Sequence, residues 1–191
     1  MAQGSTLFNQ SQSRWDNLGS IAPGEMSVSG TNDPDGLLSA LVTDGTATAG
    51  VWLTAMSGTA VSQMFFSLEL PHRYIAGTDV NVYVNWAPTT GSAAGVSWAL
   101  EYSTANKDGV FGNTTTIEAT DATAEVANTR QCGVVGTITG TTFQEDTMII
   151  GRVYRNTGAT GDTYTDYVDF LGLSFHGKTL ESGSVAEYGD G

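Results

Sequence analysis

The side chains best able to do chemistry in this sequence are two histidines, one cysteine and a set of carboxylates. His72 lies in ELPHRY and His176 in SFHGK, each at the end of a predicted strand, with no His-x-His or His-x-x-x-His spacing. Metal sites and general bases need such groups held close together. We therefore expect structural or surface roles for both histidines, and no catalytic, cofactor-binding or metal-binding residue.

The carboxylates leave one enzymatic alternative open. Glu69 and Glu101 fall on the polar phase, or at the outer end, of apolar strands. A glycoside hydrolase or depolymerase needs two carboxylates facing each other across a cleft. Because acids on the exposed face of a sheet need no such role, we expect a protein that is not an enzyme.

Two short acidic segments resemble the start of a calcium loop. NDPDG contains Asn32, Asp33 and Asp35, and GDTYTD contains Asp162 and Asp166. The Glu that would close an EF-hand loop is missing at the required offset from NDPDG. Proline pre-sets its own φ, aspartate bonds the nearby backbone and glycine tolerates positive φ, so NDPDG indicates a turn.

The charge balance limits the possible partners. The 191 residues contain 20 Asp and Glu against 7 Lys and Arg, which gives a net charge of -13. A surface this acidic repels phosphate backbones and anionic lipid, so neither nucleic acid nor membrane is expected as a partner. No motif for phosphate, dinucleotide or a serine nucleophile accompanies it.

The single cysteine, Cys132, excludes a disulfide within the monomer. Its neighbours in QCGVVGTITG are apolar or small, so we expect a buried structural thiol. The start, MAQGSTLFNQ, has neither a basic region nor an apolar run, so no secretory signal is expected. These features favour synthesis in a cytoplasm.

Alternation of apolar and polar residues is the main structural signal. In DVNVYVNWAP, the valines and Trp86 share one face, and in VSWALEY, Trp98 is in phase with the aliphatic residues. Side chains two apart in a strand point the same way, so both indoles should lie in the core. Tyr83 is out of phase and flanked by asparagines, which favours the surface.

About eight such runs, with no convincing amphipathic helix, predict an all-β fold. We expect an antiparallel β-sandwich that is jelly-roll-like, because one apolar face per strand requires stacked sheets and unequal loops favour Greek-key wiring. The expected organisation is an irregular N-terminal arm over residues 1–36, the sandwich over 37–178 and a polar tail over 179–191.

One C-terminal pattern carries a resemblance to a known family. GDTYTDYVDFLGLSFHGK, residues 161–178, together with the preceding TMIIGRVYRN, resembles the closing strands of jelly-roll proteins on tailed bacteriophage particles. The hairpin NVYVNWAPTTGSAAGVSWALEY fits the same kind of domain, so the resemblance covers about residues 50–178. It implies a non-enzymatic virion structural protein: a capsid decoration (cement) protein, a head fibre, or a collar or tail accessory protein.

The resemblance also implies partners. Proteins of this kind are often homotrimers, and the expected partners are further copies of the chain and the major capsid protein or another virion protein, with no cofactor. The protein would be made in the host cytoplasm and act in the virion. The apolar residues of the N-terminal segment are the expected docking anchors: Leu7, Phe8, Trp15, Leu18 and Ile21.

The alternative is a carbohydrate- or receptor-binding module of a phage tail or fibre. Such a module needs exposed aromatic side chains as a ligand platform, and the candidates are Tyr83, Trp52 and Tyr164. One measurement, the mass of the protein in solution, distinguishes the two interpretations. A trimer in solution favours the virion component, and a monomer favours the binding module.

Overall fold

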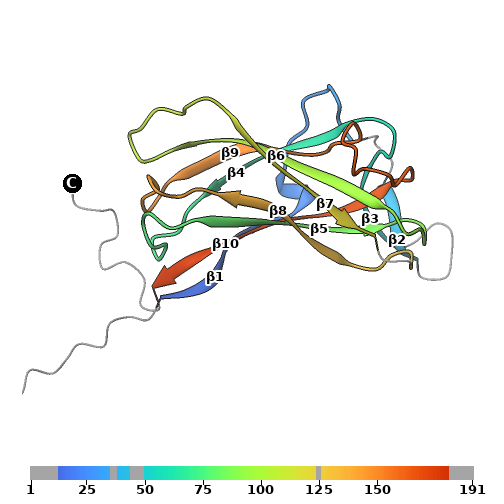
Figure 1. Cartoon of the computed structure of the whole chain (residues 1–191), viewed down its shortest axis with the longest axis horizontal. Helices are drawn as coiled ribbons and strands as arrows, with labels where there is room; N and C mark the ends of the chain where they lie inside the picture. Colours follow the sequence, from blue (N-terminus) through green and yellow to red (C-terminus); the bar gives the residue numbers. More distant parts are fainter. Residues whose placement is uncertain (1–12, 35–37, 44–49, 124–125, 181–191) are drawn as a thin grey trace, which may run out of the picture.

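The computed structural model describes residues 13–34, 38–43, 50–123 and 126–180, without the side chains of 38–43 and 50–52. These residues form two antiparallel sheets that face each other as a sandwich (Figure 1). The only helical element among them is a short 3₁₀ turn, η1 (Pro23–Glu25). The prediction of an all-β antiparallel sandwich is confirmed.

The larger sheet has six strands, in the order β2-β3-β10-β5-β8, with β1 paired to the free side of β10. Its members are β1 (Ser13–Ile21), β2 (Leu38–Thr43), β3 (Gly50–Met56), β5 (Val80–Pro88), β8 (Gln131–Ile138) and β10 (Val168–Leu180). β10 is the longest strand and lies between β5 on one side and β3 and β1 on the other. It is therefore the centre of this sheet.

The smaller sheet has four strands, in the order β4-β9-β6-β7. Its members are β4 (Ser62–Glu69), β6 (Gly95–Ala105), β7 (Thr115–Ala122) and β9 (Met148–Arg155). β7 carries the Thr-rich sequence predicted as an edge strand, and it does lie at the edge. Polar residues are tolerated there because one side of the hydrogen-bond ladder faces away from the sheet.

The connections between the sheets follow jelly-roll wiring. From β3 to β10 the chain passes back and forth between the sheets, so that β3-β10-β5-β8 faces β4-β9-β6-β7. Eight strands in two interleaved Greek keys are the definition of a jelly roll. The expected eight strands therefore form the jelly roll, and β1 and β2 extend its six-stranded sheet.

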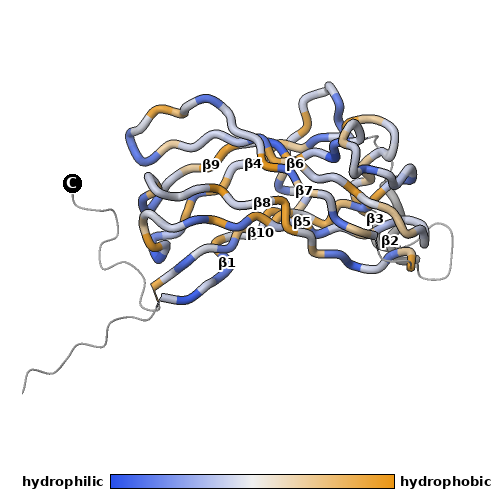
Figure 2. Tube along the Cα trace, viewed as in Figure 1, coloured by the Kyte–Doolittle hydropathy of each residue, from blue (hydrophilic) through white to orange (hydrophobic). Residues whose placement is uncertain are grey.

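The hairpin expected over residues 81–102 is wrong, because its two runs are β5 and β6, which lie in opposite sheets. The core lies between the sheets and contains the tryptophans of both strands. Trp86 and Trp98 are 0% and 1% exposed, and their ring centroids lie 6.2 Å apart. Phe170 packs against Trp98 at 5.9 Å. The phase of the strands therefore correctly predicted that both indoles lie in the core. Figure 2 shows apolar and polar residues interspersed along the strands, as that alternation requires.

The expectation of an irregular arm over residues 1–36 is wrong for residues 13–21. This segment is strand β1, which lies beside the end of β10 (Figure 1). A register shift between Asn17 and Gly19 interrupts its alternation, so its apolar residues recur every third position and hide the strand from a search for period two. Gly172 makes the approach possible, since a Cβ there would stand 2.5 Å from the Ile21 carbonyl oxygen.

The predicted start of the C-terminal tail also differs from the structure. The polar tail was expected to begin at residue 179, but Thr179 and Leu180 are the last residues of β10, and Thr179 is fully buried. β1 pairs with both residues, Arg14 with Thr179 and Ser13 with Leu180, which gives the end of β10 a partner and keeps it in the sheet. Residues 181–191 lie outside the described part of the chain.

A loop next to the 3₁₀ turn covers the free edge of β4. Ser27 forms a backbone bridge with Phe65, and the Gln63 N–H donates to the carbonyl of Asn32. The Asp33 carboxylate accepts the N–H groups of Ser29 and its neighbour Gly30. The described residues of the predicted turn, 32–34, belong to this loop, and residues 35 and 36 lie outside the described part of the chain. The loop pairs the edge of β4 in place of an open strand edge. None of the described helical segments is long and apolar enough to cross a membrane.

Candidate functional site

The outer face of the four-stranded sheet carries a row of functional side chains. Phe65 on β4 is in register with Arg152 on β9, and Arg152 is in register with Glu101 on β6. The inward positions of these strands hold core residues, so the alternation of side chains places this row on the outside. Tyr154, two residues after Arg152, lies on the same face.

Arg152 is held from several directions. Its Nε donates to Glu101 Oε2 at 2.7 Å, its Nη2 lies 2.6 Å from the same oxygen, and its Nη1 donates to Gln63 Oε1. The guanidinium carbon stands 4.7 Å from the Tyr154 ring centroid, a cation–π distance. The hydroxyl of Thr114 donates to Glu101 Oε1 at 2.8 Å. The side chains of Arg152 and Glu101 are therefore held in place, although they lie on a surface where a side chain without such contacts usually moves.

The electrostatics of the row follow from these contacts. The Thr114 hydroxyl, followed by the Arg152 guanidinium, holds the pKa of Glu101 below its ordinary value. Burial raises the pKa of the Tyr154 phenol, with a smaller opposing effect of Arg152. At neutral pH the row therefore presents a carboxylate, a guanidinium and a neutral phenol.

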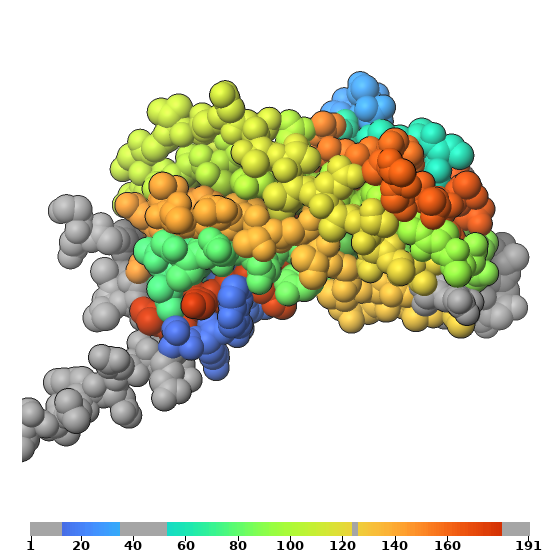
Figure 3. Space-filling view, viewed as in Figure 1, coloured from blue at the N-terminus to red at the C-terminus, as the bar shows by residue number. Residues whose placement is uncertain are grey.

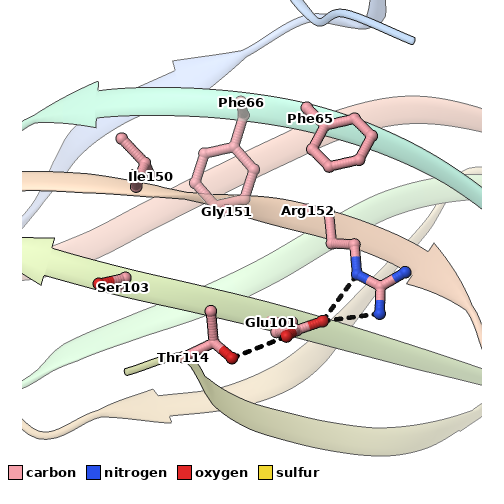
Figure 4. Close-up of a pocket in the computed structure, with 8 residues that line it drawn as sticks. All are labelled: Phe65, Phe66, Glu101, Ser103, Thr114, Ile150, Gly151 and Arg152. Carbon is pink, nitrogen blue, oxygen red and sulfur yellow. Dashed lines mark hydrogen bonds and ion pairs between the residues drawn. The ribbon is translucent and has the colours of Figure 1, made fainter. Parts of the chain in front are cut away.

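An open hollow of about 300 Å³ lies over this row. Figure 4 shows Arg152 turned towards Glu101, with Thr114 reaching the carboxylate from the other side and Phe65 on the neighbouring strand, at the end of the Arg152 side chain away from Glu101. Ser103 and Ile150 complete the walls. The hollow thus combines apolar walls with a few fixed polar groups, which is the usual make-up of a ligand site.

A second, larger hollow of about 550 Å³ lies on the outer face of the six-stranded sheet. Asn85 donates to the Ser174 hydroxyl at 2.9 Å and accepts from Arg130 at 2.5 Å. His176 also lines this hollow, and its ring centroid lies 4.9 Å from that of Tyr83. This hollow has hydrogen-bonding groups, but its single described arginine is exposed and is bonded to an amide.

The acids of GDTYTD serve a buried anchor instead of a calcium site. Arg155 donates to both carboxylate oxygens of Asp162 and to the main-chain oxygens of Tyr164 and Asp166. The Asp166 carboxylate accepts the Thr90 hydroxyl at 2.7 Å. Figure 3 shows this C-terminal loop in contact with the loop that contains Thr90, at one end of the sandwich. Its acidic side chains are thus occupied by protein donors.

The three aromatic residues predicted as ligand contacts have different outcomes. Tyr83 is half-buried on the outer face of the six-stranded sheet. Tyr164 is 2% exposed, so its prediction as a surface contact is wrong: its hydroxyl bonds Thr90 and Arg155 lies 5.7 Å from its ring centroid. The side chain of Trp52 lies outside the described part of the structure, although β3 contains its backbone.

The five predicted docking anchors also have different outcomes. Leu18 and Ile21 are each 7% exposed and belong to the core, so the structure corrects their assignment to a docking surface. Trp15 is 54% exposed and stays a prediction. Leu7 and Phe8 lie outside the described residues.

The two histidines lie in separate environments. His72 Nε2 lies 3.4 Å from Asp146 Oδ1, and its Nδ1 lies 3.8 Å from Glu145 Oε2. His176 lies on the outer face of β10 beside Tyr83. Within the described ranges, no group of three or more His, Cys, Asp or Glu side chains is placed to hold a metal ion.

The carboxylates raised as a glycosidase pair are far apart. Glu69 is in register with Met148, which is in register with Ala105. Glu69 therefore stands two strands across and four residues along from Glu101, a Cα separation of roughly 16 Å. The two carboxylates of a glycosidase face each other across one cleft, roughly 5–10 Å apart, whereas Glu101 and Glu69 line separate hollows.

Cys132 is exposed, which corrects the expectation of a buried thiol. The apolar neighbours that suggested burial alternate with it along β8, where Gly133 and Val135 face inward. Cys132 therefore has the outward phase and lines the larger hollow.

Sequence reasoning named Glu101 but missed its partners. Arg152 and Tyr154 are out of phase with the core residues of β9, and this is the signal that places them outside. Phe65 gives the same signal on β4. Which strands lie next to each other was not visible, because Glu101 and Arg152 are 51 residues apart in the chain.

Comparison with known proteins gives a fold-level picture. No protein-family model and no curated protein matches the sequence. Among solved structures, the carbohydrate-binding module TmCBM61, in complex with β-1,4-galactotriose, is 16% identical with a TM-score of 0.35, over 86% of this chain and 88% of that one. The xylan-binding domain CBM22-1 of Paenibacillus barcinonensis Xyn10C is 11% identical with a TM-score of 0.39, over 90% and 97%.

A viral protein is similar at the same level. The structure of infectious bursal disease virus, Gx strain, is 13% identical with a TM-score of 0.31, over 77% of this chain and 38% of that chain. Identities and TM-scores this low transfer no ligand, partner or site residue to this protein. The jelly-roll assignment rests on its own strand order.

Proposed function

We propose that this protein is a non-enzymatic structural component of a virion, a capsid decoration protein that oligomerises and docks on the particle. One observation carries the proposal. Residues 161–178, whose sequence resembles the closing strands of phage jelly rolls, contribute the Arg155-bound loop and most of the central strand β10. Asp162 and Asp166 in that pattern are engaged in building the fold, which supports a structural role for this segment.

Trp15 supports a docking role for the N-terminal segment. Its side chain is 54% exposed on β1, opposite Lys178 of β10. Leu7 and Phe8 are further apolar residues of the same N-terminal segment in the sequence. A large exposed aromatic beside further apolar residues is the composition of a protein interface.

The mass in solution tests self-assembly, and co-sedimentation tests docking. We expect a homotrimer of 20.0 kDa chains, about 60 kDa by light scattering. We also expect the purified protein to sediment with capsid shells that lack it, and a variant without residues 1–12 to stay in the supernatant. The truncation must end before Ser13, because β1 begins there. A monomer that does not sediment with shells contradicts the proposal.

A second candidate, a receptor-binding module of a tail or fibre, is favoured by the hollow over Arg152 and Glu101. A decoration protein needs no such hollow on an open face, whereas apolar walls with a few fixed polar groups suit a receptor-binding module. The test is competition: the purified protein would reduce adsorption of particles to host cells. Unchanged adsorption at saturating protein contradicts this candidate.

A further inference from the structure

We propose that the hollow on the outer face of the four-stranded sheet binds a neutral sugar chain, with Arg152 and Glu101 bonding its hydroxyls. This deepens the receptor-binding candidate and rests on it. The hollow lies over β4, β9 and β6, whose registered residues supply the contacts. It is open to solvent, so a chain can lie across it.

Aromatic rings supply the apolar part of the site. Phe65 is the cross-strand neighbour of Arg152 on β4, Tyr154 lies two residues along β9 from it, and both are half-buried. One face of a pyranose ring presents mainly C–H groups, which gain free energy when an aromatic ring removes them from water. Phe65 lines the hollow directly, and the ring of Tyr154 lies against the guanidinium at 4.7 Å.

The charged pair has hydrogen-bonding capacity left for hydroxyls. Of the five N–H groups of Arg152, three make bonds to Glu101 and Gln63, which leaves two within the described part of the chain. Each Glu101 oxygen can accept further bonds. Two neighbouring hydroxyls on a sugar ring can therefore accept from Arg152 and donate to Glu101 at once. Bonds to charged groups of this kind are the stronger class.

The site is also pre-organised. Thr114 and Gln63 hold the two charged side chains from opposite sides, so little side-chain freedom remains to be lost when a ligand binds. The loop over residues 27–32 fixes Gln63 in turn, through its backbone N–H and its side-chain amide. An isolated exposed ion pair contributes only about 0–1 kcal/mol to stability. Stability alone therefore gives little reason for so many converging groups.

Charge selects a neutral ligand. The chain carries a net charge of -13, and Glu101 balances the charge of Arg152. An anionic polysaccharide would meet a repulsive field with no uncompensated cation in this row to receive it. A neutral chain with adjacent hydroxyls suits the donors and acceptors without that penalty.

The test uses the full-length protein on an array of neutral and anionic oligosaccharides, followed by calorimetric titration of the best neutral hit. We expect neutral chains to be retained and anionic ones not. Tyr154→Ala and Glu101→Gln should each lower the affinity about tenfold or more. Tyr83→Ala is the matched control, because it removes a half-buried tyrosine from the opposite outer face. It should change the affinity less than about twofold.

Three results would each contradict the proposed sugar site. They are an array without a neutral hit, a preference for anionic chains, and a loss of affinity in Tyr83→Ala that Tyr154→Ala does not share. Circular dichroism checks that each variant is folded. The trimer mass and co-sedimentation with shells are measured on the same samples. Because neither depends on sugar, loss of the sugar site leaves the decoration role standing, and loss of that role leaves the sugar site standing.

Discussion

The guanidinium of Arg155 and the carboxylate of Asp162 form a bidentate ion pair inside the protein, with side chains 0% and 2% exposed. Arg155 has the inward phase of β9, which it shares with the core residues Ile149 and Val153. Removing two charges from water costs several kcal/mol each unless their partners are complete. Here the arginine also bonds two main-chain oxygens, so the pair fastens the 156–167 loop to the sandwich.

Arg155→Met should destabilise the protein strongly. The methionine fills the space, but Asp162 then stays buried without its counter-charge, and such a loss costs about 3–5 kcal/mol. Urea unfolding followed by circular dichroism measures the change. Arg14→Ala is the control, because the Arg14–Asp16 pair is exposed and should contribute less than about 0.5–1 kcal/mol. Equal losses in the two variants would contradict the anchoring role.

The two core tryptophans should respond differently to replacement by phenylalanine. Trp86 Nε1 donates to Asp121 at 3.1 Å, whereas Trp98 Nε1 has no acceptor among the described residues. Both variants lose buried ring area, but only Trp86→Phe also breaks a hydrogen bond. Its unfolding free energy should therefore fall by about 1 kcal/mol more than that of Trp98→Phe. Denaturant titration of both variants decides, and a larger loss for Trp98→Phe would be inconsistent with this hydrogen-bond assignment.

The strands with regular alternation were predictable from the sequence. The inward phase of Trp86 and Trp98 follows from side chains two apart sharing a face, and the structure agrees. β1 was not predictable in this way, because its bulge at Leu18 breaks the alternation on which the prediction depends. Cys132 shows the converse error: its neighbours are apolar, but phase and not local composition decides burial.

The site was only half predictable. Phase puts Glu101, Arg152 and Phe65 on outer faces, and each can be read from its own strand. The three residues share one face of a sheet only because β9 lies between β4 and β6. This strand order is a property of the jelly-roll wiring. Tyr164 fails for a related reason, since its burial comes from Arg155 and Thr90, which a local pattern does not show.

Stability should depend on the charge of Glu101. Its pKa is lower in the folded protein than its ordinary value of 4.5, because of the Thr114 hydroxyl and then Arg152. A depressed folded-state pKa adds stability above the unfolded pKa, and that stability is lost as the pH falls through the folded value. The stability difference between the wild type and Glu101→Gln should therefore be constant near neutrality and shrink on acidification below about pH 5.

Urea unfolding from about pH 6 to pH 3 measures this difference. Thr114→Ala is the informative companion variant, because removing the first cause should raise the folded-state pKa of Glu101 towards its ordinary value. Carbon-detected NMR titration of the Glu101 carboxyl reports that pKa directly. A wild-type advantage that grows as the pH falls would have the wrong sign and would rule out this assignment.

Trp15 and Leu18 separate docking from folding within one strand. Trp15 is 54% exposed and Leu18 is 7% exposed, although only two residues stand between them. Trp15→Ser should leave the unfolding free energy within about 0.5 kcal/mol of the wild type, since exposed positions contribute little. It should nevertheless reduce co-sedimentation with capsid shells. Leu18→Ala should instead cost about 2–5 kcal/mol because it empties a core position, and it should keep its docking at temperatures where it is folded. If both variants sedimented like the wild type, β1 would serve the fold alone, and the docking surface would have to lie elsewhere.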